Sequence, residues 1–518
     1  MSWKPESDEI ERRRSAAAEH GGSAAVAAQH ERGRLAVRER ISALVDADSF
    51  REFGRIAGEA ETDTDGRMLE FTPANAVGGT AKIDSRPVVV CGDDFTIRGA
   101  AYSAVGLKKA QHADALAIRR RVPLIRLLEA TGASVTGTTA SRGRSGYDMT
   151  APPILNLLCA EALASVPVVC AALGPVAGFA AARLAAAHFS VMTRETSQVL
   201  TGGPVLVERA LREKVSKQEL GGAQVHGHSG VVDNVAEDEA DVWRQIRAFL
   251  SYLPTSMWAR APRLDSGDPR GREDANLLEV IPRNRRRAYK VRRVIESVVD
   301  RGSFFELTPG FGRSQVTGLA RADGHAVGVL ANDGYHDGGA MTATGAQKVR
   351  RFIDLCDSFG LPIVSFVDEP GFMIGAQAEA DATVRHGMIA MFAALQSQVP
   401  WFVVLLRRSF GVAQGIHLGR DNTIVAWPSA ESGALPVESG VALAFRSEIE
   451  SAADPDERRR ELEDQMAQAQ SIFPRAEEFG VHDLIDPRQT RPRLCDWLDE
   501  IQPQLDGPRG PRQYSLRP

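Results

Sequence analysis

The stretch with the clearest chemical potential runs from Phe366 to Gly375 and reads Phe-Val-Asp-Glu-Pro-Gly-Phe-Met-Ile-Gly. The apolar run from Leu361 to Val367 is typical of a buried parallel strand. Pro370 and Gly371 end that strand and turn the chain sharply, which can aim free backbone N–H groups into a cleft. Such groups can hold an enolate oxygen, because their dipoles stabilise the negative charge on it. An isolated Pro-Gly is usually an ordinary turn, so the case depends on repetition.

The chain makes this arrangement twice, because its halves repeat the same order of segments. Val316-Thr-Gly-Leu-Ala-Arg321 repeats Val77-Gly-Gly-Thr-Ala-Lys82, and Val399-Pro-Trp-Phe-Val-Val repeats Val166-Pro-Val-Val-Cys-Ala. The spacing between matching segments drifts only from about 254 to about 233 residues. A period this long indicates a duplicated domain rather than a solenoid. We therefore predict an N-terminal arm or helix and two domains, with the boundaries 1–29, 30–265 and 272–505.

Each half alternates strands with helices, which predicts an α/β fold with a mostly parallel sheet. Ligands of such sheets sit at the C-terminal ends of the strands. In each half two strands end in turns rich in Gly and Ala, where backbone N–H groups can approach a ligand closely. These turns are Thr131-Gly132-Ala133, Ala177-Gly178-Phe179-Ala180, Pro370-Gly371-Phe372 and Phe410-Gly411-Val412-Ala413. Two turns per half supply the two N–H groups of an oxyanion hole, so the chain would have two such holes.

Bulk properties exclude several classes of function. The 518 residues are 43% hydrophobic and 25% charged, an ordinary globular composition, and the net charge of −5 gives no electrostatic case for nucleic acid. No run of 18 apolar residues occurs and the first residues lack an apolar core, so we expect neither a membrane span nor a signal peptide. The five cysteines are scattered without a CxxC pair, which argues against a zinc ribbon and a disulfide framework. We expect a cytoplasmic, reducing setting.

Two polar segments are predicted to be exposed. The excursion from Glu59 to Gly66 is predicted to be a surface loop. The basic run Arg285–Arg287, which continues through Lys290 to Arg293, is predicted to be a solvated helix.

Several motifs together resemble the carboxyltransferase (beta) subunit of biotin-dependent acyl-CoA carboxylases, propionyl-CoA carboxylase in particular, from about Arg32 to about Arg493. The most specific is Glu219-Leu-Gly-Gly-Ala223 followed by His226 and Ser229-Gly230-Val231. The others are Asp94-Phe-Thr96, Val367-Asp-x-Pro-Gly-Phe372, Arg385-His-Gly387 and Ala426-Trp-Pro-Ser-Ala-Glu431. The resemblance implies two tandem crotonase-like (ClpP/crotonase) domains in one chain, the first on the acyl-CoA side and the second on the biotin side.

The resemblance also implies a reaction. Carboxybiotin, tethered to a carrier protein, would release CO₂, and the resulting biotin nitrogen anion would take the α-proton of an acyl-CoA. The enolate would then attack CO₂, so that the cofactor serves as the base and no side-chain nucleophile or metal is needed. One oxyanion hole would serve the thioester enolate and the other the biotin ureido oxygen.

The implied partners lie on other chains. This chain has no Met-Lys-Met biotinylation site and no apparent ATP-binding loop, so a biotin carboxylase and biotin carboxyl carrier (alpha) subunit must supply those steps. The resemblance implies a homo-oligomer, typically a hexamer, with the active site at a subunit interface. It implies no nucleic acid and no membrane partner.

Site residues follow from the resemblance position by position. The acyl-CoA side would comprise Gly132, Ala133, Gly178 and Phe179, and the biotin side Gly371, Phe372, Val412 and Ala413. Predicted substrate contacts are Arg98, Gly99 and Ala100 at the CoA entrance, Lys108 with Lys109 near the CoA phosphates, and Gln414 with Gly415. Alternatives remain for three features: the lysines as a solvated helix face, the Arg285 run as a phosphate or subunit contact, and His226 as a histidine satisfied by local hydrogen bonds, which we favour.

Departures from the family pattern concern the acyl pocket. Phe179 and Val412 replace the usual glycines of the turns, and backbone donors survive such changes although the pocket narrows. Gly415 stands where propionyl-CoA carboxylases usually carry an Asp that shapes the pocket, and an unusual segment surrounds Pro436. An atypical acyl group is therefore a hypothesis. Two other functions stay open: a biotin-dependent decarboxylase subunit that runs the same enolate chemistry backwards, and a non-catalytic scaffold subunit with a decayed site.

Overall fold

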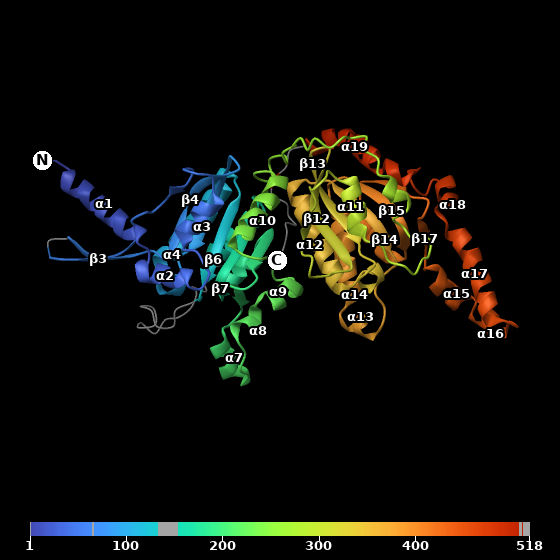
Figure 1. Ribbon diagram of the computed structural model, residues 1–518, viewed down its shortest axis with the longest axis horizontal. Helices are drawn as coiled ribbons and strands as arrows, with labels where there is room; N and C mark the ends of the chain where they lie inside the picture. Colours follow the sequence, from blue (N-terminus) through green and yellow to red (C-terminus); the bar gives the residue numbers. More distant parts are fainter. Residues whose placement is uncertain (1, 65–66, 133–153, 507–509, 511–518) are drawn as a thin grey trace. The chain divides into compact units, whose positions relative to one another are not determined.

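A computed structural model describes residues 2–64, 67–132, 154–506 and 510 of the chain. The chain divides into two compact units, unit 1 up to Ala259 and unit 2 from Arg260 to Arg509. Each unit is built on an eight-stranded mixed sheet with helices packed against it (Figure 1). The predicted α/β fold with two similar domains in tandem is thereby confirmed.

The sheet of unit 1 has the order β1-β4-β5-β6-β7-β8-β10, and β9 pairs with β7. β4 and β5 form an antiparallel hairpin, whereas the neighbours from β5 to β10 run parallel. The hairpin turns at Asp84 and Ser85, which both have the positive φ of a turn that matches strand twist. The strands are β1 (Arg51–Glu52), β4 (Ala76–Ile83), β5 (Arg86–Asp93), β6 (Leu124–Ala130), β7 (Val168–Ala177), β8 (Phe189–Thr193), β9 (Gln198–Leu200) and β10 (Asn234–Ala236).

The segment predicted as a surface loop after Glu59 is in part a strand, so that prediction is wrong. β2 (Gly58–Thr62) pairs antiparallel with β3 (Met68–Pro73) in a separate two-stranded sheet. β2 is largely exposed on both faces and therefore lacks the apolar alternation by which a half-buried strand is recognised. Backbone pairing with β3 holds it in place.

Among the helices of unit 1, α4, α8 and α10 have a side-chain cap at the N-terminus. The longest, α4, begins after Ser103, whose hydroxyl accepts the Gly106 N–H at 3.0 Å, and ends at Arg121 in the left-handed region. The helices are α1 (Lys4–Ala18), α2 (Ser23–His30), α3 (Val37–Leu44), η1 (Arg98–Ala100), α4 (Ala104–Arg120), α5 (Ile154–Leu163), α6 (Phe179–Ala185), α7 (Pro204–Leu211), α8 (Lys217–Gly221), α9 (Ala223–Ser229) and α10 (Glu239–Tyr252).

Unit 2 repeats this sheet with the order β11-β12-β13-β14-β15-β16-β18, and β17 pairs with β15. The antiparallel hairpin is β12–β13, and the strands from β13 onward run parallel. The strands are β11 (Phe305–Leu307), β12 (Gln315–Ala322), β13 (His325–Asn332), β14 (Ile363–Glu369), β15 (Trp401–Phe410), β16 (Asn422–Ala426), β17 (Glu431–Gly433) and β18 (Asp483–Leu484).

The helices of unit 2 repeat the end signals of unit 1. α12 begins after Thr342, whose hydroxyl accepts the Gly345 N–H at 2.9 Å, and ends at Gly360 in the left-handed region. The helices are η3 (Ala275–Leu278), α11 (Val291–Val298), η4 (Asp337–Gly339), α12 (Ala343–Phe359), α13 (Ala376–Ala380), α14 (Thr383–Gln396), η5 (Val412–His417), α15 (Val437–Ala444), α16 (Arg446–Ser451), α17 (Pro455–Gln470), α18 (Ile472–Glu477), η6 (Pro487–Gln489), α19 (Thr490–Glu500) and α20 (Gln502–Leu505).

The basic run Arg285–Arg287 is not helical, so its prediction as a solvated helix is wrong. Asn284 forms a turn there instead, because its side-chain Oδ1 accepts the Arg286 N–H at 2.9 Å and its carbonyl accepts the Arg287 N–H at 3.1 Å. The helix α11 starts only after Lys290.

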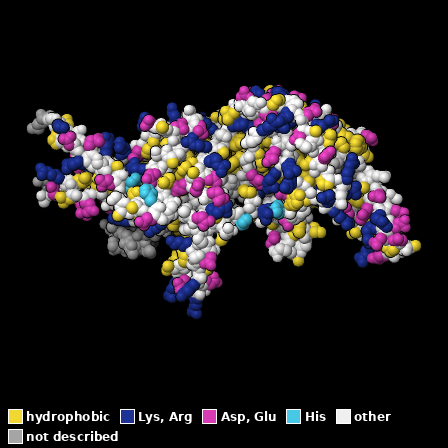
Figure 2. Space-filling view, in the orientation of Figure 1, with side chains coloured by type: hydrophobic (Ala, Val, Ile, Leu, Met, Phe, Trp, Pro, Cys, Tyr) yellow, Lys and Arg dark blue, Asp and Glu magenta, His cyan; other side chains and the backbone are white. Residues whose placement is uncertain are grey.

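Three further features of the described residues concern surface charge, membrane-spanning helices and cysteines. Figure 2 shows Lys and Arg side chains interspersed with Asp and Glu over the visible face. None of the described helices is long and apolar enough to cross a membrane. All five cysteines are buried free thiols.

Candidate functional site

In unit 1 the predicted turns follow β6 and β7 and lie side by side. Gly132 and Gly178 have φ values of +90° and +62°, which L-residues with a side chain rarely adopt. A Cβ atom on Gly132 would lie 3.3 Å from the Ala177 carbonyl oxygen and 3.9 Å from the Gly178 Cα. The two glycines therefore face each other, as expected if both turns contribute to one site.

The amide of Gly178 is not available to a ligand, because it donates to the Leu200 carbonyl at 3.1 Å. Phe179 is the first residue of α6, where helix geometry provides no intrahelical acceptor for the amide. No hydrogen bond joins the Phe179 amide to any other described residue. Gly178 thus contributes its conformation and Phe179 the N–H group, while the predicted site residue Ala133 lies outside the described residues.

The predicted CoA-entrance residues lie against the first turn. Arg98, Gly99 and Ala100 form η1, a turn with positive φ throughout. The Gly99 carbonyl accepts both the backbone N–H of Thr131 at 3.0 Å and its hydroxyl at 3.1 Å. These bonds hold η1 beside Gly132.

The aromatic ring of Phe179 forms part of a wall beside that turn. The N–H of Tyr102 donates to the Gly132 carbonyl at 3.1 Å, and its ring meets Phe179 edge to face with 6.0 Å between centroids. Phe179 therefore places bulk at the position that a glycine usually holds in the resembled family.

In unit 2 the turns after β14 and β15 repeat this design. Gly411, with φ +62°, donates its amide to the Gly433 carbonyl at 3.1 Å, as Gly178 does in unit 1. Val412 and Ala413 open η5, and neither amide bonds to another described residue. The side chain of Val412 is 63% exposed, so this end of η5 is open to a ligand.

The Gly371 turn offers the amide of Phe372 rather than its own. Gly371, with φ +123°, donates its N–H to the Oε1 atom of Glu369 at 2.9 Å. Met341 bonds to the residues on both sides of Phe372, donating to the Gly371 carbonyl and accepting the Met373 N–H. The Phe372 amide points away from Met341 and bonds to no described residue.

The helix α14 lines the site in unit 2. A Cβ atom on Gly387 would lie 2.2 Å from the Phe372 ring, so the ring lies directly on this helix. Gly415 faces Met391 of the same helix, and a Cβ atom there would lie 3.2 Å from the Met391 Cε. Gln414 accepts the Ser409 hydroxyl at 2.8 Å. The predicted contacts Gln414 and Gly415 thus lie together on η5.

Of the two lysines predicted near CoA phosphates, Lys109 is buried, so the prediction is wrong for it. Its Nζ lies 3.4 Å from the Glu52 carboxylate and 3.3 Å from the Gly54 carbonyl. Burial lowers the pKa of Lys109, although Glu52 opposes the shift. Lys348 occupies the matching place in unit 2, where it donates to two backbone carbonyls. Lys108 is exposed and stays a predicted contact.

His226 is satisfied by local partners, as we favoured. Its Nε2 lies 2.8 Å from the Val199 carbonyl and its Nδ1 3.0 Å from the Ser229 hydroxyl. Because a carbonyl only accepts, the proton resides on Nε2. The ring ties α9 to β9.

Sequence reasoning missed the buried carboxylates behind both pairs of turns. In unit 1, Glu129 near the end of β6 accepts from Arg34 and Arg40 at 2.5 Å each and from Gln29 at 2.9 Å. Burial lowers the pKa of Arg40, but the charges of Glu129 and Glu239 outweigh it and raise the pKa above its ordinary value. An acid near the end of an apolar strand was the available signal.

Asp368 plays the same part in unit 2. Arg407 and Arg408 of β15 donate to its carboxylate at 2.8 and 2.7 Å, and all three side chains lie largely inside the protein. Burial alone would raise the pKa of Asp368, but the charges of Arg408 and Arg407 outweigh it and hold the pKa below its ordinary value.

Comparison with known proteins identifies the family. Residues 28–501 match the carboxyl transferase domain. The chain is 33% identical over 500 residues to the carboxyltransferase subunit of propionyl-CoA carboxylase from Haloferax mediterranei, covering 95% of each chain. The chain belongs to the carboxyl transferase domain family. It is a carboxyltransferase of the biotin-dependent acyl-CoA carboxylase class, as the motifs predicted.

Two further relatives of this carboxyltransferase bear on function. The methylmalonyl-CoA decarboxylase subunit alpha of Veillonella parvula is 29% identical over 505 residues, covering 96% of each chain. The crystal structure of transcarboxylase 12S, a hexamer described with methylmalonyl-coenzyme A bound, superimposes with a TM-score of 0.88 at 28% identity and covers 100% of this chain and 97% of that one. This likeness agrees with the tandem crotonase-like fold.

The arginine run of the carboxyltransferase lines a cavity beside the second pair of turns. Arg285, Arg286 and Arg287 border a space of about 220 Å³ together with Arg408 and Phe410. Arg407 donates to the Arg287 carbonyl at 2.9 Å, which fixes the run against β15. The basic run therefore borders this cavity and is not a solvated helix.

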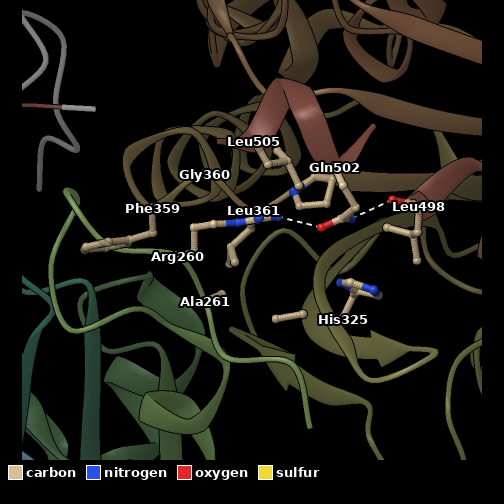
Figure 3. A pocket seen from close by; sticks show the side chains of 11 residues that line it. Arg260, Ala261, His325, Phe359, Gly360, Leu361, Leu498, Gln502 and Leu505 are labelled. Carbon is tan, nitrogen blue, oxygen red and sulfur yellow. Dashed lines mark hydrogen bonds between the residues drawn. The ribbon is translucent and has the colours of Figure 1, made fainter. Parts of the chain in front are cut away.

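A smaller cavity shown in Figure 3 lies at the other edge of this sheet, where β13 begins and β14 is about to begin. Its volume is about 30 Å³, room for one water molecule. Arg260 reaches across it to Gln502 at 2.5 Å. Because ligands of parallel sheets bind at the opposite, C-terminal edge, this cavity is structural.

Near that cavity Asp323, His325 and Asp499 place possible metal-ligand atoms within 4.8 Å of one another. Arg270 already pairs with both carboxylates, at 3.2 and 2.7 Å. The cluster is therefore explained by ion pairs.

The two ion pairs that Asp368 forms with Arg407 and Arg408, called the clamp below, give a stability prediction. Asp368→Ala would leave Arg407 and Arg408 buried without a counter-charge, and we expect the free energy of unfolding to fall by roughly 3–5 kcal/mol. Chemical denaturation at pH 7 measures this. Glu450→Ala is the control, because it breaks an exposed ion pair with Arg446 and should cost about 0.5 kcal/mol or less. Equal effects of the two substitutions would contradict the clamp.

The same variant should show a pH signature. Because the pKa of Asp368 is lower in the folded state, its stabilisation is present above the ordinary carboxyl pKa and is lost as pH falls through the folded value. The stability difference between parent and Asp368→Ala should therefore narrow below about pH 4.

Proposed function

We propose that the chain moves a carboxyl group between carboxybiotin on a carrier protein and the α-carbon of an acyl-CoA, through an enolate held by backbone N–H groups. The observation that carries this proposal is a repeated one. In each unit a left-handed glycine ends a central strand, bonds back into the sheet, and leaves the next amide uncommitted at Phe179 or Val412. Two such donors are what a reaction with charge at two oxygens requires.

Unit 1 would take the thioester. The Phe179 amide, together with the neighbouring Gly132 turn, would receive the thioester oxygen as it gains negative charge. Exposed Lys108 and the η1 turn around Arg98 flank this region and would contact CoA. Phe179 and Tyr102 would exclude water from the enolate.

Unit 2 would take the biotin ring. The amides of Phe372, Val412 and Ala413 come from two turns and would donate to the ureido oxygen, which accepts but does not donate. Bound there, carboxybiotin supplies the CO₂ and a base for the α-proton. The chain itself would position the biotin ring and polarise its ureido oxygen, which is consistent with a site built from backbone donors.

A homo-oligomer is part of the proposal. The helix α14 exposes Val384, Ile389, Phe392 and Leu395, and Ile374 nearby is 83% exposed. Apolar residues gathered in this way usually mark an interface. Since the related transcarboxylase 12S is described as a hexamer, we propose the same for this chain, with each site shared between unit 1 of one subunit and unit 2 of another. Light scattering that returned the 56.0 kDa of a single chain would reject this.

The acyl group is proposed to differ from propionyl. Phe179 narrows the acyl-CoA side against Tyr102, whereas Gly415 opens space beside Met391. Both changes alter the shape of the pocket relative to the resembled propionyl-CoA carboxylases.

The direct test uses the purified chain with free biotin and a panel of carboxylated acyl-CoAs. We expect the chain to transfer the carboxyl group to biotin. The preferred donor should be a carboxylated acyl-CoA other than methylmalonyl-CoA. A clear optimum at methylmalonyl-CoA, the carboxylated form of propionyl-CoA, would reject the atypical pocket. Binding of acyl-CoA without transfer, even when a biotinylated carrier is supplied, would identify a scaffold subunit instead.

A decarboxylase is the second candidate, because one relative is a methylmalonyl-CoA decarboxylase subunit. Copurification from the native host would separate the two. A carboxylase would bring a biotinylated chain with a biotin carboxylase and would require ATP and bicarbonate. A decarboxylase would release CO₂ without either.

The amide donors can be removed one at a time. Phe179 and Val412 are the first residues of helices, where the backbone tolerates proline. Proline at these positions removes the backbone N–H group without breaking a helical hydrogen bond. We expect Phe179→Pro and Val412→Pro each to lower kcat roughly 10²- to 10³-fold. Phe179→Ala and Val412→Ala, which also shorten the side chain but keep the amide, are the matched controls. If proline and alanine variants are equally active, the amides are not the donors.

A further inference from the structure

One turn of unit 2 carries a buried acid–histidine pair that the matching turn of unit 1 lacks. Glu369, the last residue of β14, and His417, the last residue of η5, are both 0% exposed. The His417 Nε2 lies 3.2 Å from the Glu369 Oε2. Burying two titratable side chains is costly unless each finds a partner, so the pair requires a reason.

The internal repeat shows that the fold itself does not need this pair. Glu369 pairs with Ser409 across β14 and β15 as Ala130 pairs with Val176 across β6 and β7. His417 follows Gly411 at the same distance along the chain as Leu184 follows Gly178. Unit 1 thus builds the same two turns with Ala130 and Leu184, both fully buried.

The carboxylate of Glu369 is fixed on both of its oxygens. Oε1 accepts the Gly371 N–H at 2.9 Å, while Oε2 accepts from the Asn332 side chain at 3.0 Å and lies beside His417. Asn332 is itself anchored, since its amide also donates to the Gly339 carbonyl at 3.0 Å. The turn at Gly371 is therefore tied to β13, β14 and η5 together.

This network decides which amides face the site. It commits the Gly371 N–H to the interior and so holds φ at +123°, the conformation that leaves the Phe372 amide pointing out. It also joins the Gly371 turn to the far end of η5, whose first residues are Val412 and Ala413. In unit 1 the Gly132 amide has no acceptor among the described residues, since Ala130 offers none.

We propose that Glu369 and His417 are positioning residues for the biotin side, which set the spacing and direction of the Phe372 and Val412 amides for the oxygen of a cyclic urea. The proposal rests on the proposed function. Neither side chain touches the reacting atoms, because both are enclosed behind the turns.

The kinetic test measures transfer to free biotin from the carboxylated acyl-CoA that the panel above identifies as the preferred donor. In this reaction the carboxyl group leaves the α-carbon for the ureido nitrogen, and the proton of that nitrogen goes to the α-carbon. Glu369→Ala should lower kcat/KM for biotin roughly 10- to 100-fold, because the amides lose their alignment. KM for that acyl-CoA should stay unchanged, since unit 1 would hold the thioester. Glu369→Gln keeps an oxygen for the Gly371 N–H and should recover most of the loss.

A double variant separates positioning from folding. Glu369→Ala alone removes the carboxylate beside His417 and leaves the ring with longer contacts to Asn332 and Ser365 at 3.4 and 3.5 Å, whereas Glu369→Ala with His417→Leu installs the pair that unit 1 uses. We expect the double variant to regain melting temperature relative to Glu369→Ala but to keep the loss in kcat/KM for biotin. A double variant with the parent's kcat/KM for biotin would overturn the proposal.

Hydrogen exchange provides a readout that does not require activity. The peptide containing Gly371 and Phe372 should exchange faster in Glu369→Ala and in the double variant than in the parent, while the peptide containing Gly178 should be unaffected. Unchanged exchange at Gly371 would overturn the proposal even if the parent is active. If the parent shows no transfer, the proposed function fails, and the exchange result still decides whether Glu369 holds the turn.

Discussion

A buried carboxylate held by two guanidinium groups is the constraint on which both sites depend. Glu129 and Asp368 each lie next to the end of a central strand, just before the turn that presents the amides. A carboxylate in such a place could not stay ionised alone, because burial strongly disfavours the charge. The paired arginines compensate, and their rigid geometry fixes where the strand stops. The turns that carry the uncommitted amides begin from that end point.

The two units reach the same end by different routes. In unit 1 the guanidinium groups come from Arg34 and Arg40, at and just before α3, so the chain start must fold onto the sheet before the clamp exists. In unit 2 both come from β15, so strand pairing alone brings Arg407 to Asp368. Divergence of the partners around a retained carboxylate indicates that the clamp, rather than any one arginine, is what the repeated architecture needs.

The sequence was sufficient for the duplication, the sheet class and the four turns, because these depend on local signals: apolar strands, glycines and the spacing of repeats. It was not sufficient for the amides. Gly178 looks like a donor in sequence, yet its N–H bonds to Leu200, a partner that only the folded sheet reveals. The prediction for Lys109 was wrong for the same reason, because Lys109 forms an ion pair with Glu52, which lies in a distant segment of the chain. Buried pairings between remote residues leave no periodic trace in a chain.

The asymmetry between the sites matches the charges they would meet. An enolate concentrates charge on one oxygen, so a site that holds it gains from every amide left uncommitted, as at Gly132 and Phe179. A ureido anion would share its charge between the oxygen and one nitrogen, so the direction of each donor would matter there as well as the number of donors. Glu369 accepts the Gly371 N–H, so this amide cannot bind a ligand at the second site. The same carboxylate also holds the turn in place through Asn332 and His417. Two copies of one unit thereby present two differently held turns without any change of fold.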